Sequence, residues 1–479
     1  MTSPSSLPYR GAAPAARGDA LVDYTVVRRL RQAVAERLSA ELVALRKRRS
    51  ADVGPADRRM LGRALIDEQI AELAAGAARD GRAAPTPEQE DALAGAVFAA
   101  IFGLGRLERW VATAEIENID VNGCDQVWLS YAGGRREQAG PVADSDDELI
   151  EMIQSFAAYL GQSTREFSSA KPLLNLRLPD GSRLSAWMSV SPRPGLTIRR
   201  HRYTDIDLDD LIGLGTVDRA LAEFLRAAVR ARRNIVVTGA VNAGKTTLVR
   251  ALANEFDPAD KLVICEQEYE LGLDRLPGRH RQVISLEARD ANAEGSGAVG
   301  LPDLVVHALR MNPDRIIVGE VRSDELLPML RAMGSGCTGS LCTLHANSAA
   351  AAFGRMAAIG LASPQRLPVE ATHLLAADAV HLIVHLDLVD DTGVGGVRQR
   401  RVAGVLEVTG VGENGRVATN EVFRPGPGGR AVPGCSPASL PLLVRAGFDP
   451  GWLQRPAAQW PPPTADRDGQ AFLRAGSRS

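Results

Sequence analysis

One segment determines the architecture of this chain: Asn234-Ile235-Val236-Val237-Thr238-Gly239-Ala240-Val241-Asn242-Ala243-Gly244-Lys245-Thr246-Thr247. Its first half is an apolar run typical of a buried strand, and its second half fits the pattern G-x-x-x-x-G-K-S/T. The apolar residues Leu248, Val249 and Leu252 follow at the spacing of one buried helix face. The segment therefore predicts a strand, a phosphate-binding loop and a helix in succession.

The chemistry of this loop predicts a nucleotide site. Glycines at both ends let the backbone curl so that its N–H groups face an anion at the helix N-terminus. The Lys245 ammonium would reach the β- and γ-phosphates, and the Thr246 hydroxyl would complete the coordination shell of Mg²⁺. A chance match in a chain with 46 glycines is the alternative, which the strand-loop-helix context disfavours. We expect ATP and Mg²⁺ as ligands and the following nucleotide-binding residues: Gly239, Ala240, Val241, Asn242, Ala243, Gly244, Lys245, Thr246 and Thr247.

Composition limits the fold and the partners. Hydrophobic residues make up 45% of the 479 residues and aromatic residues only 4%, so we expect a large, mainly aliphatic interior divided among a few domains. Lys and Arg number 56 against 58 Asp and Glu, which leaves no overall field to attract nucleic acid or an anionic membrane. The basic run 46–49 is a weak local signal, since a solvated helix end explains it equally well.

Cysteine usage and the N-terminus bear on the compartment. The five cysteines show no C-x-x-C spacing, which argues against a zinc site or a disulfide framework and fits a reducing cytoplasm. Residues 1–19 lack the apolar core of a signal peptide, and no later window has the length of an uncharged membrane span. We expect a cytoplasmic protein whose association with the membrane is peripheral.

The order of patterns predicts an α/β protein with several parts. Residues 1–20 are expected to be a disordered tail and 21–105 a helical region, because apolar residues recur there at helical spacing. A smaller N-terminal α/β domain is expected at 106–205. Residues 206–424 should form the ATPase domain, with a linker at 208–214, and 425–479, rich in Pro, Gly and Arg, should be a flexible tail.

The strands of the ATPase domain are predicted individually. Apolar segments at 262–265, 283–286, 315–318 and 341–344 alternate with helical stretches, which indicates a RecA-like, largely parallel sheet with helices on both faces. Later strand segments, separated by turn residues, suggest an added antiparallel meander between 380 and 423.

An acidic residue follows the strand at 315–318. Because Glu320 should emerge at the C-terminal edge of the sheet beside the phosphate loop, we expect it to orient the attacking water or to hold Mg²⁺ through its coordination shell. The alternative is that Glu320 only caps the next helix. A catalytic role is favoured because the acid lies downstream of a complete phosphate loop.

Other polar residues should reach the same sheet edge. Glu266 and Glu270 follow the strand that ends at Cys265, and such acids suit the positioning of metal or water. His345 follows the strand at 341–344, where it could hydrogen-bond the γ-phosphate or be purely structural. Several arginines lie just ahead of the ATPase domain in the sequence. They could form a second wall for the nucleotide phosphates or only a charged strand edge, and they are Arg177, Arg183, Arg199, Arg200 and Arg202.

These residues together resemble a known family, the secretion ATPases of type II and type IV systems, and in particular the CpaF-type branch that drives tight-adherence pili. The resemblance spans about residues 104–423. It is carried by the phosphate loop and by the segments 119–123, 178–183, 197–200, 308–322 and 339–348.

The resemblance implies a homo-hexameric ring in which nucleotide binds where an N-terminal domain meets a RecA-like domain. It implies that Glu320 is the catalytic glutamate and that Glu266, Glu270 and His345 belong to acidic and histidine motifs of the site. It also implies a partner, an inner-membrane platform protein of a pilus or secretion machine. Arginines expected to approach the nucleotide, by the same resemblance, are Arg199, Arg200, Arg310 and Arg322.

The chain departs from the family pattern at a few positions. Gln267 replaces an acid of the acidic motif, and Cys337-Thr338 replace a His-Asp pair of the histidine motif. We therefore keep three hypotheses: an ATPase motor, a nucleotide-gated scaffold with little turnover, and a DNA-translocating ring. The last is disfavoured by the near-neutral charge and by the lack of interleaved aromatic and basic residues.

Overall fold

The computed structural model describes residues 22–49, 53–131, 134–159, 167–200, 203–289, 291, 295–394 and 398–454. Contacts divide the chain into two compact units. The first unit comprises 1–129, 137–176 and 184–198, and the second comprises 130–136, 177–183 and 199–479. The tail expected at 1–20 lies outside the described residues.

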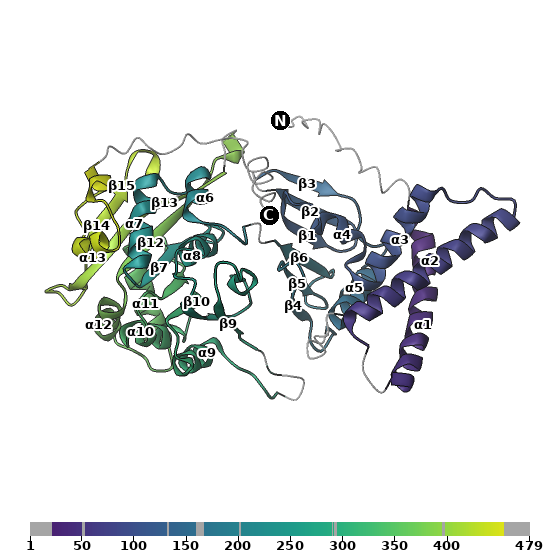
Figure 1. Cartoon of the computed structure of the whole chain (residues 1–479), viewed down its shortest axis with the longest axis horizontal. Coiled ribbons are helices and arrows are strands. Elements are labelled where there is room, and N and C mark those ends of the chain that lie inside the picture. Colours follow the sequence, from purple (N-terminus) through teal and green to yellow (C-terminus); the bar gives the residue numbers. More distant parts are fainter. Residues whose placement is uncertain are drawn as a thin grey trace, which may run out of the picture. The chain divides into compact units, whose positions relative to one another are not determined.

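The first unit begins with helices. α1 (Tyr24–Arg49), α2 (Pro55–Arg79) and α3 (Pro87–Phe102) pack around a shared apolar core that includes Val34, Ile66 and Val97. α3 begins at Thr86, whose side chain accepts a hydrogen bond from the Gln89 N–H in a capping box. η2 (Gly105–Leu107) and α4 (Glu108–Val111) follow. The helices group together in Figure 1, as the apolar periodicity at 21–105 predicts.

A six-stranded sheet completes the first unit, in the order β3-β2-β1-β6-β5-β4. α5 (Asp146–Tyr159) packs against α3. The strands are β1 (Ile116–Asn122), β2 (Gln126–Tyr131), β3 (Arg136–Ala139), β4 (Leu173–Arg177), β5 (Arg183–Trp187) and β6 (Gly195–Arg199).

The second unit is built on a nine-stranded sheet, in the order β15-β14-β13-β12-β7-β11-β10-β8-β9. Every neighbouring pair from β12 through β9 is parallel. The predicted parallel strands are therefore confirmed, and they are β7 (Ile235–Gly239), β8 (Lys261–Glu266), β9 (Gln282–Glu287), β10 (Arg315–Val321) and β11 (Leu341–Leu344).

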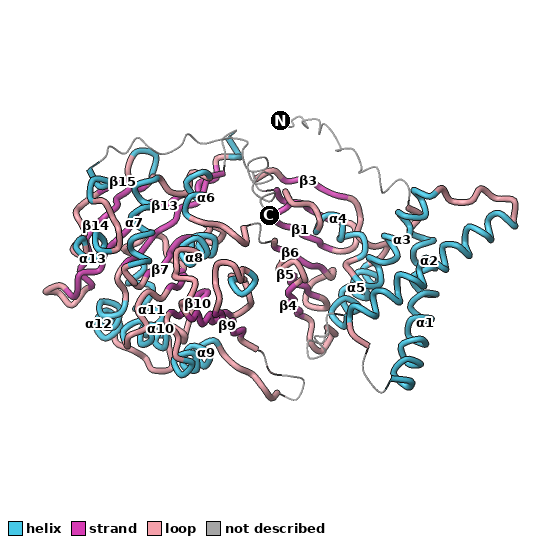
Figure 2. Tube along the Cα trace, in the orientation of Figure 1, coloured by secondary structure: helices cyan, strands magenta, loops and turns pink. Residues whose placement is uncertain are grey.

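Helices cover both faces of this sheet, as predicted (Figure 2). On one face, Ile235 and Val237 of β7 share a core with α6 (Leu208–Gly213), α7 (Arg219–Arg230) and α8 (Lys245–Ala253). On the other face, Val236 shares a core with the remaining long helices. Those helices are α9 (Leu301–Ala308), α10 (Leu326–Gly334), α11 (Ala351–Ala362) and α12 (Val369–Ala379).

The predicted meander is present and is joined to the parallel sheet. β12 (Leu382–Asp390) pairs with β7 in parallel and with β13 (Arg398–Val411) in antiparallel fashion. β14 (Val417–Pro425) and β15 (Ala431–Pro433) add two more antiparallel pairs. Short 3₁₀ turns occur at η3 (Leu273–Arg275), η4 (Leu309–Met311), η5 (Thr392–Val394), η6 (Pro427–Gly429) and η7 (Pro450–Gln454).

Two expectations are wrong in this unit. The expected linker is the helix α6, because Asp207 and Asp210 form a capping box at its start. The flexible tail expected from residue 425 does not begin there, since β15 and α13 (Leu440–Arg445) are formed and Leu443 and Phe448 are buried in the core. The buried Glu407 accepts a hydrogen bond of 2.8 Å from the Ser439 N–H and so holds this segment against β13. Residues 455–479 lie outside the description.

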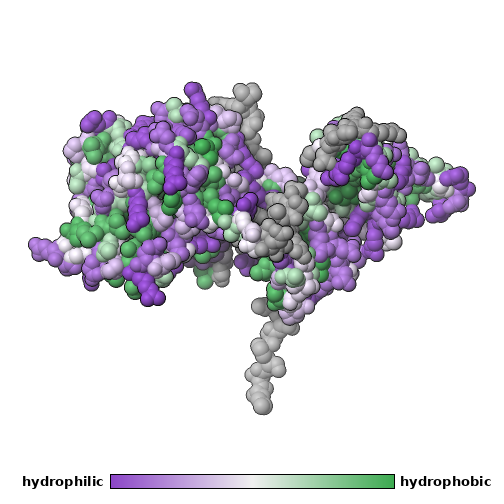
Figure 3. Space-filling view, turned by 90° about the horizontal axis from the view of Figure 1, so that it is seen from below, coloured by the Kyte–Doolittle hydropathy of each residue, from purple (hydrophilic) through white to green (hydrophobic). Residues whose placement is uncertain are grey.

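The surface carries scattered apolar residues. Leu361 and Leu374 expose more than half of their area, and Figure 3 shows apolar residues mixed with polar ones on the viewed face. Within the described part of the chain, no helix combines the length and the apolar character that a membrane crossing requires.

Asn234 fixes the start of β7, the strand that leads to the phosphate loop. It is fully buried, and its Oδ1 accepts from the N–H groups of Gly339 and Ser340 at 2.8 and 3.1 Å. Its Nδ2 donates to the carbonyls of Met333 and Ala379 at 3.0 and 2.7 Å. One side chain thus ties β7 to the segments before β11 and β12.

Replacing Asn234 with Ala should leave these four buried backbone groups without their partner. We expect a loss of roughly 2–4 kcal/mol in the free energy of unfolding. The midpoint of urea unfolding measures it. Asn414→Ala, in an exposed turn, is the control and should change stability by less than about 0.5 kcal/mol. Equal midpoints for the two variants would contradict this account of Asn234.

Candidate nucleotide-binding site

The phosphate loop connects β7 to α8, as the sequence predicts. Three of its residues have positive φ: Gly239 at 153°, Asn242 at 63° and Gly244 at 95°. The left-handed region is readily accessible to Gly and is tolerated by Asn. A Cβ on Gly239 would also lie 2.6 Å from the carbonyl oxygen of Leu386. Backbone conformation and close packing both require glycine at this position.

The loop presents unused hydrogen-bond donors. α8 begins at Lys245, and the first N–H groups of a helix have no partner inside it. Among the described residues, the N–H groups of Gly244, Lys245 and Thr246 have no acceptor. Because the helix dipole adds a partial positive charge at the same point, this arrangement suits a phosphate group.

The Lys245 ammonium lies within the curve of the loop. Only 8% of the residue is exposed, and Nζ donates to the carbonyls of Gly239 at 3.3 Å and Ala240 at 2.9 Å. Burial lowers the pKa of Lys245 to about 8, although the charges of Glu320 and Glu270 act in the opposite direction. The lysine is thus a desolvated cation held next to the expected position of the phosphates.

A short chain of polar side chains runs from Lys245 to Glu320. Lys245 Nζ lies 3.2 Å from Nδ1 of His345, and Nε2 of His345 lies 2.5 Å from Oε1 of Glu320. In the neutral tautomer whose Nδ1 accepts from Lys245, Nε2 carries the ring proton and faces Glu320. Burial, followed by the charge of Lys245, lowers the pKa of His345. His345 is therefore neutral near pH 7 and separates a cation from a carboxylate.

Glu320 lies on β10 with its two oxygens in different surroundings. Oε2 accepts a 2.6 Å hydrogen bond from Nη2 of Arg322. Oε1 is buried and, despite its short distance to His345, has no well-aligned donor among the described residues. Glu325, not Glu320, stands at the N-cap of α10. Oε1 thus faces the ring nitrogen of His345 and keeps a lone pair that can accept from a further donor.

Glu266 is the last residue of β8 and Glu270 follows the strand, and the Glu270 carboxylate lies 3.5 Å from Nη1 of Arg183. Glu266 is 3% exposed, and its Oε1 accepts from the N–H groups of Glu270 at 3.0 Å and Leu271 at 2.9 Å. Burial raises the pKa of Glu266 to about 7. Arg250 of α8 holds the same segment through the Leu271 carbonyl at 2.9 Å. These contacts make Glu266 an organiser of the loop at 266–271.

The predicted arginines lie in several places. Arg322 contacts Glu320, and the charge of the exposed Arg199 contributes to lowering the pKa of Lys245. Arg200 lies 3.9 Å from Asp180. Arg310 is exposed on η4, and no contact among the described residues joins it to Glu320 or Lys245. Arg202 lies outside the described residues, and the roles of these arginines stay predictions.

Three supporting residues were missed by sequence reasoning. Arg250 holds the segment at 270–271, and Arg400 donates from β13 to the Asn242 carbonyl. Gly319 lets Glu266 approach, because a Cβ there would lie 2.9 Å from Cγ of Glu266. A supporting role for Arg250 could have been inferred from its position on α8, five residues after Lys245. Arg400 carries no local signal, since its partner is 158 residues away.

A Mg²⁺ ion is compatible with these residues. Thr246 follows Lys245 in the first turn of α8, and its hydroxyl has no hydrogen-bond partner among the described residues. Within the same part of the chain, no three His, Cys, Asp or Glu side chains are grouped to hold a metal. Mg²⁺ in nucleotide sites takes most of its ligands from phosphate and water, so one hydroxyl and a nearby carboxylate suffice.

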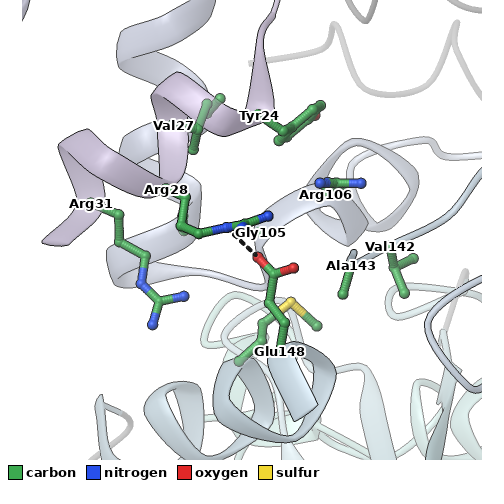
Figure 4. A pocket seen from close by; sticks show the side chains of 12 residues that line it. Tyr24, Val27, Arg28, Arg31, Gly105, Arg106, Val142, Ala143 and Glu148 are labelled. Atoms are coloured by element: carbon green, nitrogen blue, oxygen red, sulfur yellow. Dashed lines mark ion pairs between the residues drawn. The ribbon is translucent and has the colours of Figure 1, made fainter. Parts of the chain in front are cut away.

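The first unit contains a separate pocket (Figure 4). It lies between α1, η2 and α5, and its lining includes Tyr24, Arg28 and Met152. Arg28 and Arg106 both pair with Asp144, and the Arg106 guanidinium stacks 4.0 Å from the Tyr24 ring centre. Arg28 also lies 4.0 Å from Glu148, and Arg31 lies 3.9 Å from Glu151, so each arginine of the lining has an acidic partner, which reduces the attraction of the pocket for an anion.

Comparisons with known proteins place the sequence in a family. A family model described as type II/IV secretion system protein matches residues 103–428, which is more than half of the chain. A putative conjugal transfer protein of Mycobacterium tuberculosis is 33% identical over 292 residues, covering 59% of this chain and 80% of the relative. The type IV secretion system protein PtlH of Bordetella pertussis is 30% identical over 309 residues, covering 59% and 88%.

A solved structure is also similar. The VirB11 ATPase from the Brucella suis type IV secretion system is 26% identical, with a TM-score of 0.33, over 64% of this chain and 93% of that chain.

The lowered pKa of Lys245 predicts pH-dependent nucleotide binding. As pH rises through about 8 the ammonium loses its proton, and with it the attraction for phosphate. Between pH 7 and pH 9 we expect the Kd for Mg-ADP to rise about tenfold, in proportion to the lost protonated fraction.

Titration with a fluorescent ADP analogue measures this change. Lys245→Ala should bind much more weakly and should lose most of the pH dependence. A wild-type Kd that stays constant over this range would show that Lys245 does not contribute its charge to binding.

Proposed function

Because this chain belongs to the type II/IV secretion system protein family, we propose that it is an ATP hydrolase that converts nucleotide turnover into movement for pilus assembly or protein secretion. The observation that carries this proposal is the cluster of Lys245, His345 and Glu320 at the phosphate loop. A buried cation, free N–H donors and a carboxylate with one available oxygen are the groups that phosphoryl transfer to water requires.

Binding of ATP would change the partners of Lys245. In the structure its ammonium is shared by loop carbonyls and His345. The β- and γ-phosphates are stronger, charged acceptors, so Lys245 would turn toward them. His345 would then lose its donor, which makes it a sensor of the γ-phosphate.

Glu320 would act on the attacking water. Its Oε1 has no aligned donor among the described residues and can accept a proton from a water placed in line with the γ-phosphate. Arg322 holds the other oxygen and so fixes the direction of the carboxylate. The charge of Glu270, like that of Glu320, favours the protonated form of Lys245. Glu266 would act indirectly, by shaping the loop at 266–271.

Thr246 would hold Mg²⁺ together with Glu320, which would act through a water of the coordination shell. When bound, the ion supplies neutralisation of the charge that develops on the phosphate oxygens. Arg199, Arg200, Arg310 and Arg322 are proposed to approach the nucleotide once the assembly is complete.

We further propose a homo-hexamer on the cytoplasmic face of the inner membrane, working on a platform protein there. This assignment and the CpaF-type branch are supported by the sequence resemblance. Work would arise because ATP-bound and ADP-bound forms favour different conformations, so that each turnover shifts their populations. Single-stranded DNA is not expected to stimulate turnover, because net charge is near zero.

A nucleotide-gated scaffold is the second candidate, favoured by the substitutions at Gln267, Cys337 and Thr338. Cys337 and Thr338 precede β11, and the Cys337 carbonyl accepts from the Ser340 hydroxyl at 2.7 Å. His345, which contacts Lys245, lies at the other end of that strand. The residues Cys337 and Thr338 therefore lie away from the contacts that join Lys245, His345 and Glu320.

Glu320→Gln separates the two candidates. It keeps the shape of the side chain but removes the base, so we expect phosphate release to fall about 10²- to 10³-fold while ATP binding is retained. Phosphate release and binding of a fluorescent ATP analogue provide the measurements. Glu370→Gln, on an exposed part of α12, is the matched control and should behave as wild type.

If wild type and Glu320→Gln release phosphate equally slowly yet both bind ATP, the motor proposal fails and the scaffold stands. If neither binds ATP, both candidates fail.

A further inference from the structure

The strands β12 and β13, which are remote in sequence from the phosphate loop, both contact it. β12 places Leu386 opposite Gly239, and β13 places Arg400 opposite Leu388. A Cβ on Gly244 would lie 3.3 Å from Cδ of Arg400 and 3.9 Å from Cδ2 of Leu386. The β12–β13 hairpin therefore forms a wall against both glycines of the loop.

Arg400 makes a specific bond to this loop. Its Nε donates to the carbonyl oxygen of Asn242 at 2.9 Å. Asn242 is exposed and has a φ of 63°, in the left-handed region. The bond is charge-assisted and hence stronger than one between neutral groups. It holds the one non-glycine residue of the loop with positive φ.

The bond also orients the next N–H group. In a trans peptide the carbonyl and the following N–H point in opposite directions. Holding the Asn242 carbonyl toward Arg400 therefore directs the Ala243 N–H into the loop, where it donates to the Ala240 carbonyl at 3.3 Å. Rotation of this peptide would open that turn and turn a carbonyl toward the anion.

We propose that Arg400 is a positioning residue that keeps the phosphate loop in its anion-binding conformation and thereby slows the release of a nucleoside diphosphate. The inference rests on the proposed function. It follows from pre-organisation: a loop already held in its bound shape loses less conformational freedom when the ligand binds. Arg400 acts through Asn242, so its effect belongs to nucleotide retention and not to the chemical step.

Dissociation of a fluorescent ADP analogue from the full chain, followed by stopped flow, tests the inference. Arg400→Ala should accelerate release about five- to tenfold, and Arg400→Lys, which keeps the charge and most of the stem, should lie between it and wild type. Arg398→Ala is the matched control, because Arg398 lies on the same face of β13 and pairs with Asp390 at 3.5 Å. It should change release by less than about twofold.

Faster release could also result from a general loss of stability, which would lower the midpoint of thermal unfolding. Thermal unfolding of each variant is therefore measured alongside. If Arg400→Ala does not fold, Arg400→Gln replaces it with the same criterion. Equal release rates for the Arg400 and Arg398 variants would overturn the inference while leaving the proposed function intact. Failure of the wild-type chain to bind the analogue would instead overturn the proposed function.

Discussion

A protonated amine removed from water is the constraint around which the second unit is organised. Burial disfavours the charge of Lys245, and the loop carbonyls and His345 replace only part of its hydration. Glu320 and Glu270 oppose the loss of the proton electrostatically. Even without a nucleotide, these two carboxylates therefore stabilise the protonated form of the buried Lys245. A phosphate entering this site meets a charge that is poorly solvated and therefore strongly attracting.

The backbone around this cation leaves little freedom in the choice of side chains. Gly239 meets the Leu386 carbonyl, Gly319 meets Glu266, and Asn234 satisfies four backbone groups at the base of β7. Each contact joins one strand of the sheet, or the residue that precedes it, to an element distant in sequence. The conformation of the phosphate loop therefore depends on the whole sheet. A distortion of β12 or β11 would change the position of the loop residues.

The predictable parts of this fold were those encoded locally. The strand before Gly239, the four later parallel strands and the meander follow from apolar runs and turn residues. The linker at 208–214 was predicted wrongly because its short helix depends on an Asp207–Asp210 capping box within a stretch of few residues. The tail was predicted wrongly from composition, since a single buried acid, Glu407, secures it from another strand. Pairings such as Arg400 with Asn242 depend on strand order, which periodicity does not encode.

Strand order also has a consequence for biosynthesis. The phosphate loop leaves the ribosome long before β12 and β13, which supply its wall, and before the segment at 438–439 that Glu407 binds. Until those residues emerge, β7 lacks one of its two neighbours in the sheet. A nascent or prematurely terminated chain therefore lacks the two strands that contact Gly239, Asn242 and Gly244 of the phosphate loop.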